Sequence, residues 1–172
     1  AQRFNSDFNA PNFLKVPEPI IQKYFSRIMS LKDGTKKMSK SDPSDLSRIN
    51  LTDEASDIVN KIKKAKTDPL PMPNNIEGLI ERPEAENLLG IYSSLSNKSL
   101  EDSVKEFSGK NFSDFKEKLS EVLVEKIKPI SKKINELLND VKYLDDILKE
   151  GAEKADKIES KKIKEMKKII GF

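Results

Sequence analysis

Apolar residues recur at helical spacing through most of the chain after residue 52. Side chains that return every three or four positions lie on one face of a helix, so this pattern predicts amphipathic helices. The first such stretch follows Thr52, whose hydroxyl can cap a helix, and it stops near Pro69, which cannot continue one. The apolar face of this stretch comprises Ala55, Ile58, Val59, Ile62 and Ala65.

Further helices are expected downstream, beyond a proline-rich connector at residues 67–83. Pro83 suits the first position of one helix, Ser99 the cap of a short one, and Ser113 the cap of a long one. Pro129 removes a backbone hydrogen bond inside the long helix and should kink it. The expected inward positions, in chain order, are Leu88, Leu89, Ile91, Tyr92 and Leu95; Leu100, Val104 and Phe107; Phe115, Leu119, Val122, Leu123, Ile127, Ile130, Ile134, Leu137 and Leu138; and Leu144, Ile147, Leu148, Ala155, Ile158, Ile163, Met166 and Ile169. We expect an all-α bundle of about five helices.

Residues 1–51 follow a different pattern. The short apolar run Ile28-Met29 predicts one strand, which Asp33-Gly34 should end by opening a polar loop as far as Ser44. Because the chain offers no visible sheet partner, this strand is expected to pair with sequence outside the chain. The expected fold class is therefore mainly α, in which the end of an α/β domain at residues 1–51 precedes a helical domain at residues 52–172.

Composition narrows the possible chemistry. Hydrophobic and charged residues each make up 35% of the chain, which fits a charge-rich helical protein that folds. The 32 basic residues barely exceed the 29 acidic ones, so the net charge of +3 does not by itself indicate nucleic acid. The absence of cysteine and histidine excludes disulfides, thiolate metal sites and histidine general bases. Chemistry must then use lysines, carboxylates, hydroxyls and backbone groups, and no protein-bound metal is expected.

The sequence also gives expectations about the cellular setting. No apolar run approaches the roughly 20 residues of a membrane-spanning helix, and no signal peptide opens the chain, so we expect a cytoplasmic protein without a membrane partner. The chain begins at Ala1 rather than at a methionine. We therefore expect the parent protein to begin upstream.

The segment Lys36-Lys37-Met38-Ser39-Lys40-Ser41 is the sharpest chemical feature. Three ammonium groups and two hydroxyls in one loop suit a polyphosphate, because lysines are mobile charges that can follow phosphate oxygens. The segment is not a P-loop, since GxxxxGK[ST] is absent. On charge alone, a solvated basic loop is the alternative.

The string from Lys37 to Ser41, KMSKS, is similar to the second ATP motif of class I aminoacyl-tRNA synthetases. Other stretches resemble the bacterial and organellar family of tryptophanyl-tRNA synthetases, so that the resemblance covers essentially the whole chain. These stretches are Ala1 to Asn5, Arg27 to Leu31, Thr35 to Pro43, Lys61 to Asp68, Asn87 to Ser93 and Glu150 to Ala155.

The resemblance implies ATP-dependent activation of tryptophan to tryptophanyl-adenylate and its transfer to tRNA(Trp). In that family the KMSKS loop closes on ATP, and Mg²⁺ arrives with the ATP. Lys37 and Lys40 would be the catalytic groups that stabilise charge on the departing pyrophosphate. Ser39 and Ser41 would support the loop as part of the ATP site, and the other expected adenine-side contacts are Ile28 and Met38.

The resemblance also implies what lies outside the chain. The family's HIGH-like ATP motif, its tryptophan pocket and most of its Rossmann-like fold are expected upstream of Ala1. The chain would then be a C-terminal half that is inactive alone and belongs to a homodimer when intact. Residues 52–172 would form the tRNA anticodon-binding domain.

Two alternatives remain open at this point. One is a fragment of a tyrosyl-tRNA synthetase, which shares the fold class and the KMSKS loop, and the other is a stand-alone helical RNA-binding or scaffolding module. The lysines of the last helix alternate with acidic residues, so a solvated face explains them as well as an RNA-facing one does. The lysine cluster at Lys61, Lys63, Lys64 and Lys66 fits favourable placement at a helix C-terminus.

Overall fold

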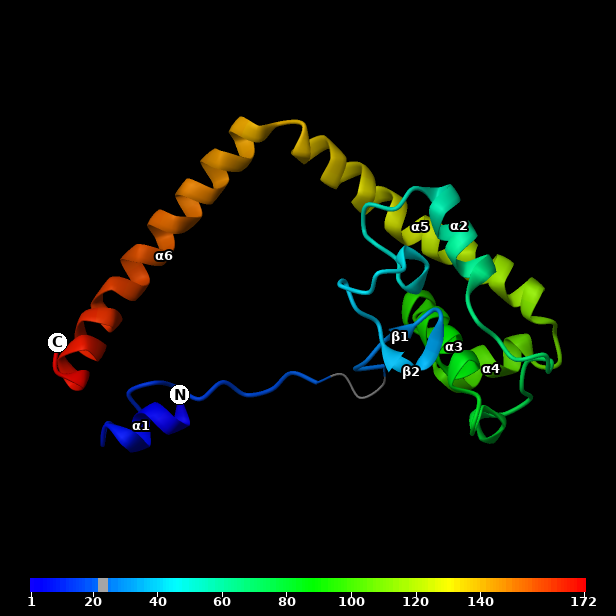
Figure 1. Ribbon diagram of the computed structural model, residues 1–172, viewed down its shortest axis with the longest axis horizontal. Coiled ribbons are helices and arrows are strands. Elements are labelled where there is room, and N and C mark those ends of the chain that lie inside the picture. The colour runs from blue at the N-terminus through cyan, green and yellow to red at the C-terminus, as the bar shows by residue number, and fades with distance from the viewer. Residues whose placement is uncertain (22–24) are drawn as a thin grey trace. The chain divides into compact units, whose positions relative to one another are not determined.

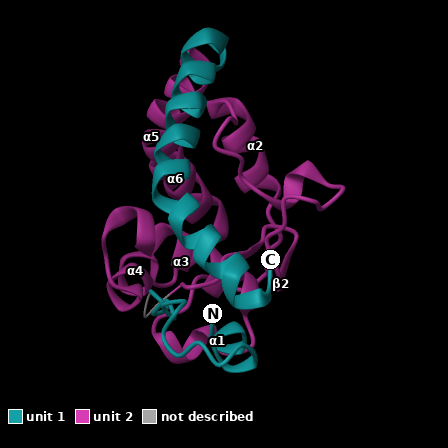
Figure 2. Cartoon of the chain, turned by 90° about the vertical axis from the view of Figure 1, so that its left-hand side faces the viewer, with its two compact units in different colours: residues 1–21, 137–172 teal, residues 22–136 magenta. Residues whose placement is uncertain are grey.

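The computed structural model describes residues 1–21 and 25–172 (Figure 1). The chain forms two compact units, one made of residues 1–21 and 137–172 and the other of residues 22–136 (Figure 2). The described part is mainly α-helical with a small antiparallel sheet, which confirms the expected mainly α class at that level.

The unit of residues 22–136 holds the sheet and most of the helices. The sheet consists of β1 (Met29–Ser30) and β2 (Asp33–Lys37), and the 3-10 turns are η1 (Asp45–Ser47) and η2 (Ile76–Leu79). The helices are α2 (Ala55–Lys64), α3 (Pro83–Ser96), α4 (Leu100–Phe107) and α5 (Phe112–Leu138), whose last residues pass into the other unit.

The hairpin corrects the expected loop after Asp33-Gly34. These two residues begin β2, which pairs antiparallel with β1, so that Met29 lies opposite Lys37 and Ser30 opposite Asp33. The expectation that β1 needs a partner from outside the chain was therefore wrong. The physical reason is that a short turn at residues 31–32 folds the chain directly back and supplies the pairing locally.

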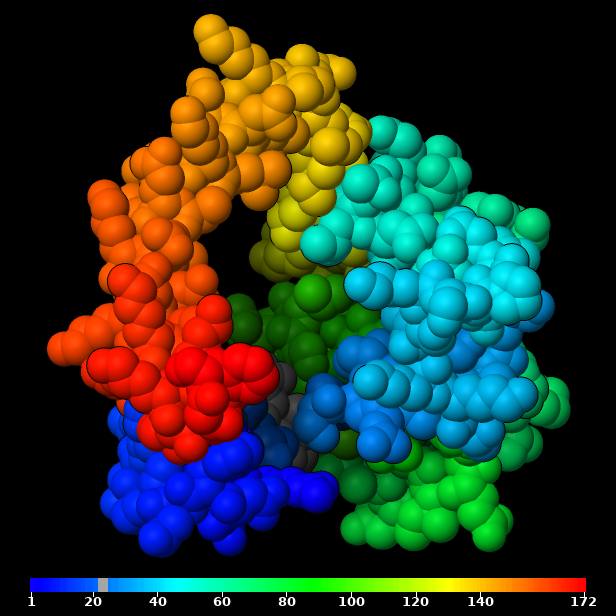
Figure 3. All heavy atoms as spheres, turned by 60° about the vertical axis from the view of Figure 1, so that its left-hand side comes forward, coloured from blue at the N-terminus to red at the C-terminus, as the bar shows by residue number. Residues whose placement is uncertain are grey.

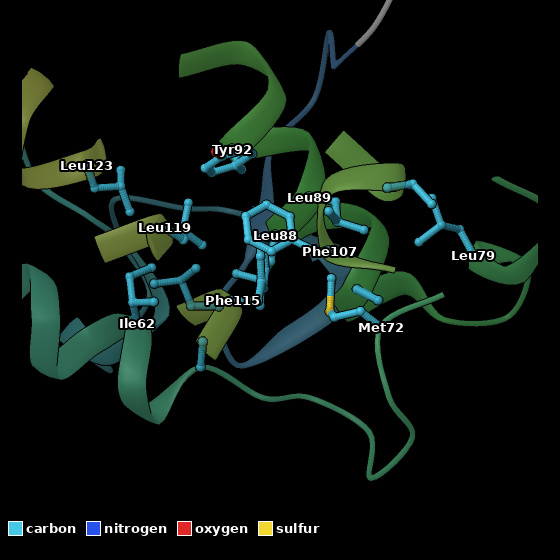
Figure 4. Packing of buried hydrophobic residues seen from close by; sticks show 14 of the residues in the cluster. Ile62, Met72, Leu79, Leu88, Leu89, Tyr92, Phe107, Phe115, Leu119 and Leu123 are labelled. Atoms are coloured by element: carbon cyan, nitrogen blue, oxygen red, sulfur yellow. The ribbon is translucent and has the colours of Figure 1, made fainter. Parts of the chain in front are cut away.

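One hydrophobic core joins the hairpin to the helices. Leu31 from the hairpin turn is buried in the same cluster as Ile58 and Ile62 of α2 and Phe115 of α5. Figure 4 shows the centre of this cluster, where the rings of Phe107 and Phe115 meet edge to face at 4.8 Å between centroids. Residues on both sides of the expected domain boundary, between residues 51 and 52, share this core. The boundary itself stays a prediction about the parent protein.

Two of the helix starts predicted from the sequence agree with the structure, and two differ. Pro83 opens α3, and the Ser99 hydroxyl accepts a hydrogen bond from the Asp102 N–H at the start of α4, both as predicted. The predicted cap Thr52 was wrong, because α2 begins at Ala55 behind a capping box in which Glu54 and Asp57 each accept the other's backbone N–H. Two carboxylates of this kind satisfy more of the free N–H groups than one hydroxyl does.

The start of α5 differs by one residue. The helix begins at Phe112, so Ser113 lies inside its first turn and is not its cap. Pro129 also lies inside α5, which continues as helix to Leu138.

The unit of residues 1–21 and 137–172 contains α1 (Gln2–Asp7) and α6 (Val141–Ile170). The Asp140 carboxylate accepts the Tyr143 N–H at the start of α6, and Gly171 ends the helix in the left-handed conformation, as its position predicted. Among the described residues, none in α6 is buried, so the inward stripe expected from Leu144 to Ile169 was wrong. An apolar stripe is buried only where a partner covers it, and the helical core is supplied by α2 to α5.

In the part of the chain that the structure describes, every helix falls short of the length or the apolar character that crossing a membrane requires.

Candidate functional site

The basic loop extends directly from the hairpin. β2 ends at Lys37, and the Met38 N–H donates to the Ile28 carbonyl at 3.0 Å, which continues the pairing of the two strands by one step. Ile28 and Met38 therefore lie side by side, both half-buried, and Met38 packs against the core. The two residues expected at the adenine are thus brought together at the base of the loop.

A side chain from α3 holds the backbone of β1. The Asn87 carboxamide accepts the Met29 N–H and donates to the Met29 carbonyl, both at 2.9 Å. Asn87 is only 7% exposed, so these bonds are largely shielded from water. The hairpin is thereby fixed on α3 at the residue next to Ile28.

Gly34 allows the other strand of the hairpin, β2, to approach α3 closely. A Cβ at this position would lie 2.6 Å from the Pro83 carbonyl carbon and from the Glu84 backbone nitrogen. Glu84 also forms an ion pair with Lys66 at 2.7 Å, which links the segment just after α2, two residues beyond its end, to the start of α3. The hydrogen bond from the Lys66 side chain lowers the pKa of Glu84, although burial opposes the shift.

The loop residues Ser39, Lys40 and Ser41 are exposed, as is Lys37 at the end of β2. Figure 3 shows the light-blue segment that contains them uncovered on the face in view. The hydroxyl oxygens of Ser39 and Ser41 lie 3.0 Å apart, and the Ser41 N–H donates to the Ser39 hydroxyl at 3.3 Å. The serines therefore shape the loop, while the lysines extend from it.

Lys37 and Lys40 form no ion pair with any residue that the structure describes, whereas Lys36 lies 3.2 Å from the Asp33 carboxylate. Uncommitted ammonium groups beside two hydroxyls suit the oxygens of a polyphosphate. The structure thus separates Lys36, which is paired with Asp33 of its own strand, from Lys37 and Lys40, which remain available to a ligand.

Asp33 shapes the turn into β2. Hydrogen bonds from the Thr35 hydroxyl and the Thr35 N–H, followed by one from Lys36, hold the pKa of Asp33 at about 2. Asp33 is therefore ionised at neutral pH and serves the hairpin rather than acid–base chemistry.

The chain that leaves the loop enters a network of charged side chains. The Arg48 guanidinium donates to the Asp42 carbonyl at 2.9 Å and lies 3.1 Å from the Asp45 carboxylate. Lys61 of α2 reaches Asp45 and Asp53, with its ammonium nitrogen 2.6 Å from an oxygen of each. Burial lowers the pKa of Lys61, but hydrogen bonds from its ammonium to Asp45 and Asp53 outweigh burial and raise the pKa above its ordinary value.

Sequence reasoning missed Asn87 and misread Lys61. Lys61 was assigned to a lysine cluster at the helix end, yet its side chain is only 4% exposed. The signal was present in the spacing, because Lys61 follows Ile58 by three positions and falls on the same face as Ile62. A charge on an apolar stripe indicates a buried ion pair. Nothing in the local pattern around Asn87 pointed to its contact with Met29, 58 positions away.

Comparison with known proteins gives one family. Residues 1–128 match the family model described as tRNA synthetases class I (W and Y). The tryptophan–tRNA ligase of Caulobacter vibrioides is 51% identical over the whole chain, which covers 50% of that protein. The tryptophan–tRNA ligase of Agrobacterium fabrum is 52% identical over 93% of the chain and 45% of its own length. The chain thus spans about half the length of the curated relatives it matches.

Solved structures agree with this similarity. The tryptophanyl-tRNA synthetase of Mycoplasma pneumoniae superposes with a TM-score of 0.84 at 26% identity, over 99% of this chain and 50% of that protein. The tryptophanyl-tRNA synthetase of Campylobacter jejuni, solved in complex with ADP and tryptophan, superposes with a TM-score of 0.67 over the whole chain and 51% of that protein. At 24% identity, this second likeness bears on the fold alone.

Proposed function

The chain belongs to the class I tRNA synthetases of the W and Y type, within the tryptophanyl-tRNA synthetase family, and from this membership we propose that it is the C-terminal half of a tryptophan–tRNA ligase. The intact enzyme would activate tryptophan with ATP and transfer it to tRNA(Trp). The name shared by the similar relatives supports tryptophan over tyrosine as the amino acid. The KMSKS string of Lys37 to Ser41 supports the assignment to the half that carries the second ATP motif.

One observation carries the proposal for the site. Lys37 and Lys40 extend, exposed, from a loop whose base is fixed by the backbone pairing of Ile28 with Met38. This arrangement fits a nucleotide. Its adenine would lie along Ile28 and Met38, where the loop begins, and its phosphates would contact the ammonium groups of Lys37 and Lys40. Ser39 and Ser41 would keep the loop in a shape that presents both lysines to the phosphates.

The proposed chemistry is attack of the tryptophan carboxylate on the α-phosphate of ATP, with release of pyrophosphate. Negative charge then grows on the leaving group, and Lys37 and Lys40 are the groups of this chain that would stabilise it. A preorganised donor of this kind contributes about 3 to 4 kcal/mol at a transition state. Mg²⁺ would enter bound to ATP as part of the substrate. Since the chain spans about half of its relatives, we expect it not to form the adenylate alone.

For the helical part we propose a role in docking tRNA(Trp). Residues 52–172 would form the anticodon-binding domain, and the intact enzyme would be a homodimer. The exposed lysines of α6, which include Lys154, Lys157 and Lys161, support a contact with phosphates. Acidic residues between them indicate that this contact is modest.

The proposal is tested in the full-length enzyme by replacing Lys40 with alanine. Because Lys40 would act on charge that develops as pyrophosphate leaves, Lys40→Ala should lower the single-turnover rate of adenylate formation by about 100-fold or more. Tryptophan affinity should stay nearly unchanged.

Lys64→Ala is the matched control, since Lys64 is an exposed lysine on α2 outside the loop, and it should leave the rate unaltered. Equal losses of rate and tryptophan affinity in Lys40→Ala would contradict the role assigned to the loop.

A further inference from the structure

Lys61 is a buried cation for which the proposed chemistry has no use. It lies on the apolar face of α2 between Ile58 and Ile62, where a lysine is rarely found without a partner. Its ammonium group contacts Asp45 and Asp53 at 2.6 Å each. Burying a charge is costly unless it is paired, so these two contacts determine where the ammonium can lie.

The two carboxylates come from different places. Asp53 is 9% exposed and lies two residues before α2. Its bond to Lys61 therefore joins the segment just before the helix to the same helix. The Asp45 side chain is 59% exposed and belongs to η1, which begins four residues after Ser41 of the loop. Lys61 therefore joins a fixed helix to the segment that leaves the loop.

Further bonds extend this link toward the loop. Arg48 contacts Asp45 and the Asp42 carbonyl, and the Ser44 N–H donates to the Asp42 carboxylate at 2.8 Å. The Asn50 amide donates to Asp45 and Asp53 at 3.1 and 3.0 Å, so it bridges the same two carboxylates as Lys61. A continuous set of bonds thus runs from α2 to Asp42, the residue next to Ser41.

We propose that Lys61 is a positioning residue that anchors the C-terminal end of the Lys37–Ser41 loop to α2 through Asp45. The opposite end of the loop is fixed by the hairpin and by Asn87, so the Lys61–Asp45 contact makes the loop a segment held at both ends. Its lysines then move about a defined anchor, which limits the positions from which they reach a polyphosphate. The consequence for catalysis rests on the proposed function, whereas the anchor itself does not.

Trypsin digestion of the 172-residue chain tests the anchor without substrates. Cleavage after Lys37 and Lys40 requires the loop to open so that it fits the active site of the protease. The rate of cleavage therefore follows the population of the opened form. Asp45→Ala should speed cleavage at these two sites about fivefold, because it removes a charged contact that is partly exposed to water. Its melting temperature should change by no more than about 2 °C, since Lys61 keeps Asp53 as a partner.

A second variant covers the case in which Lys61 alone is too deeply buried to replace. Lys61→Met with Asp53→Asn removes the anchor and leaves no unpaired buried charge, and it should speed loop cleavage at least as much as Asp45→Ala does. Lys98→Met is the matched control, because it breaks an ion pair that Lys98, in the connector after α3, forms with Glu106 of α4, and it should not affect the loop. Unchanged loop cleavage in both anchor variants, or an equal increase after Lys154 in α6, would overturn the proposal.

The full-length enzyme gives the kinetic arm of the test. Asp45→Ala should lower the single-turnover rate of adenylate formation about tenfold while leaving tryptophan affinity unchanged, because only the reach of the loop is altered. If the wild-type enzyme forms no tryptophanyl-adenylate, the proposed function fails, and the digestion still decides whether the anchor exists. If the enzyme is active and Asp45→Ala opens the loop without a loss of rate, the anchor has no role in positioning.

Discussion

At the scale of single residues, the Asn87 carboxamide acts as a neighbouring strand would in a larger sheet. It offers one acceptor and one donor to the Met29 backbone, which β1 would otherwise leave without a partner on that side. Two-stranded hairpins are marginally stable in water by themselves. The bond pair with α3 and the burial of Leu31 are therefore what make the hairpin a firm base for Lys37 and Lys40.

Asp33 provides a test of the turn at the same scale. Its ionised form accepts two bonds from Thr35, so the folded-state pKa of about 2 lies below the ordinary value of 3.8. A depressed carboxyl pKa means that this contribution to hairpin stability is complete above about pH 4 and is lost as the pH falls through 2. A carboxyl NMR titration of the chain should give a midpoint near 2 for Asp33.

Thr35→Val removes the hydroxyl donor, which is the largest cause of the shift, and should move that midpoint upward toward 3.8. Thr52→Val, at an exposed position outside the turn, is the control and should leave it in place. An Asp33 midpoint near 3.8 in the unmodified chain would show that the turn does not form as described.

At the scale of elements, the helices could be predicted and the hairpin could not. The three-and-four spacing of Leu88, Leu89 and Tyr92 is enough to place α3, because a helix is specified by its own sequence and its buried face. β2 reads Asp-Gly-Thr-Lys-Lys and has no apolar alternation, so its strand character comes from pairing with β1 rather than from its own residues. The family resemblance singled out Ile28 and Met38 only as expected contacts of adenine, and the hydrogen bond that joins them at the base of the loop depends on that pairing.

Replacing glycine with alanine should have opposite effects on stability at two positions. Gly151 lies in the middle of α6 with open space around it, so Gly151→Ala should stabilise that helix by about 1 kcal/mol through helix propensity. Gly90 lies in α3, where an added Cβ would overlap the ring of Phe25. Gly90→Ala should therefore destabilise the unit of residues 22–136 by about 1 to 3 kcal/mol despite the same gain in propensity.

Hydrogen exchange separates the two effects, because it reports on each helix by itself. Protection should rise along α6 in Gly151→Ala and fall along α3 in Gly90→Ala. Increased protection of α3 in Gly90→Ala would mean that the Phe25 ring does not occupy that space.

At the scale of the whole molecule, the sequence predicted the wrong burial for α6. Its apolar spacing is genuine, yet Leu148 is 70% and Ile158 81% exposed. A pattern states which face of a helix can be buried but not which surface will cover it. The proposed site shows the same limit of sequence patterns. The residues of the loop single it out in the sequence, whereas the anchor through Lys61 depends on contacts between distant elements.

The proposed tRNA contact is also a property of the whole chain. Lysines that neutralise phosphates release counterions, so affinity should fall steeply as salt rises, by about 0.7 to 0.9 log units per log unit of salt for each phosphate contacted. We expect the chain to bind tRNA(Trp) weakly with such a slope, and to discriminate little against a non-cognate tRNA. Fluorescence titrations of both tRNAs across a salt series provide the measurement, and affinity that does not change with salt would remove the docking role.

The shared core of the hairpin and the helices also determines where this gene tolerates recombination. A crossover between codons 51 and 52 would take Leu31 from one parent and the α2 residues Ile58 and Ile62 from another, which separates side chains that evolved as neighbours. A crossover at the turn of Asn139 and Asp140 falls beside the break between the compact units and leaves this core with a single parent. Chimaeras joined at the turn should therefore inherit an intact loop and its anchor, whereas those joined at codon 51 would have to evolve that packing again.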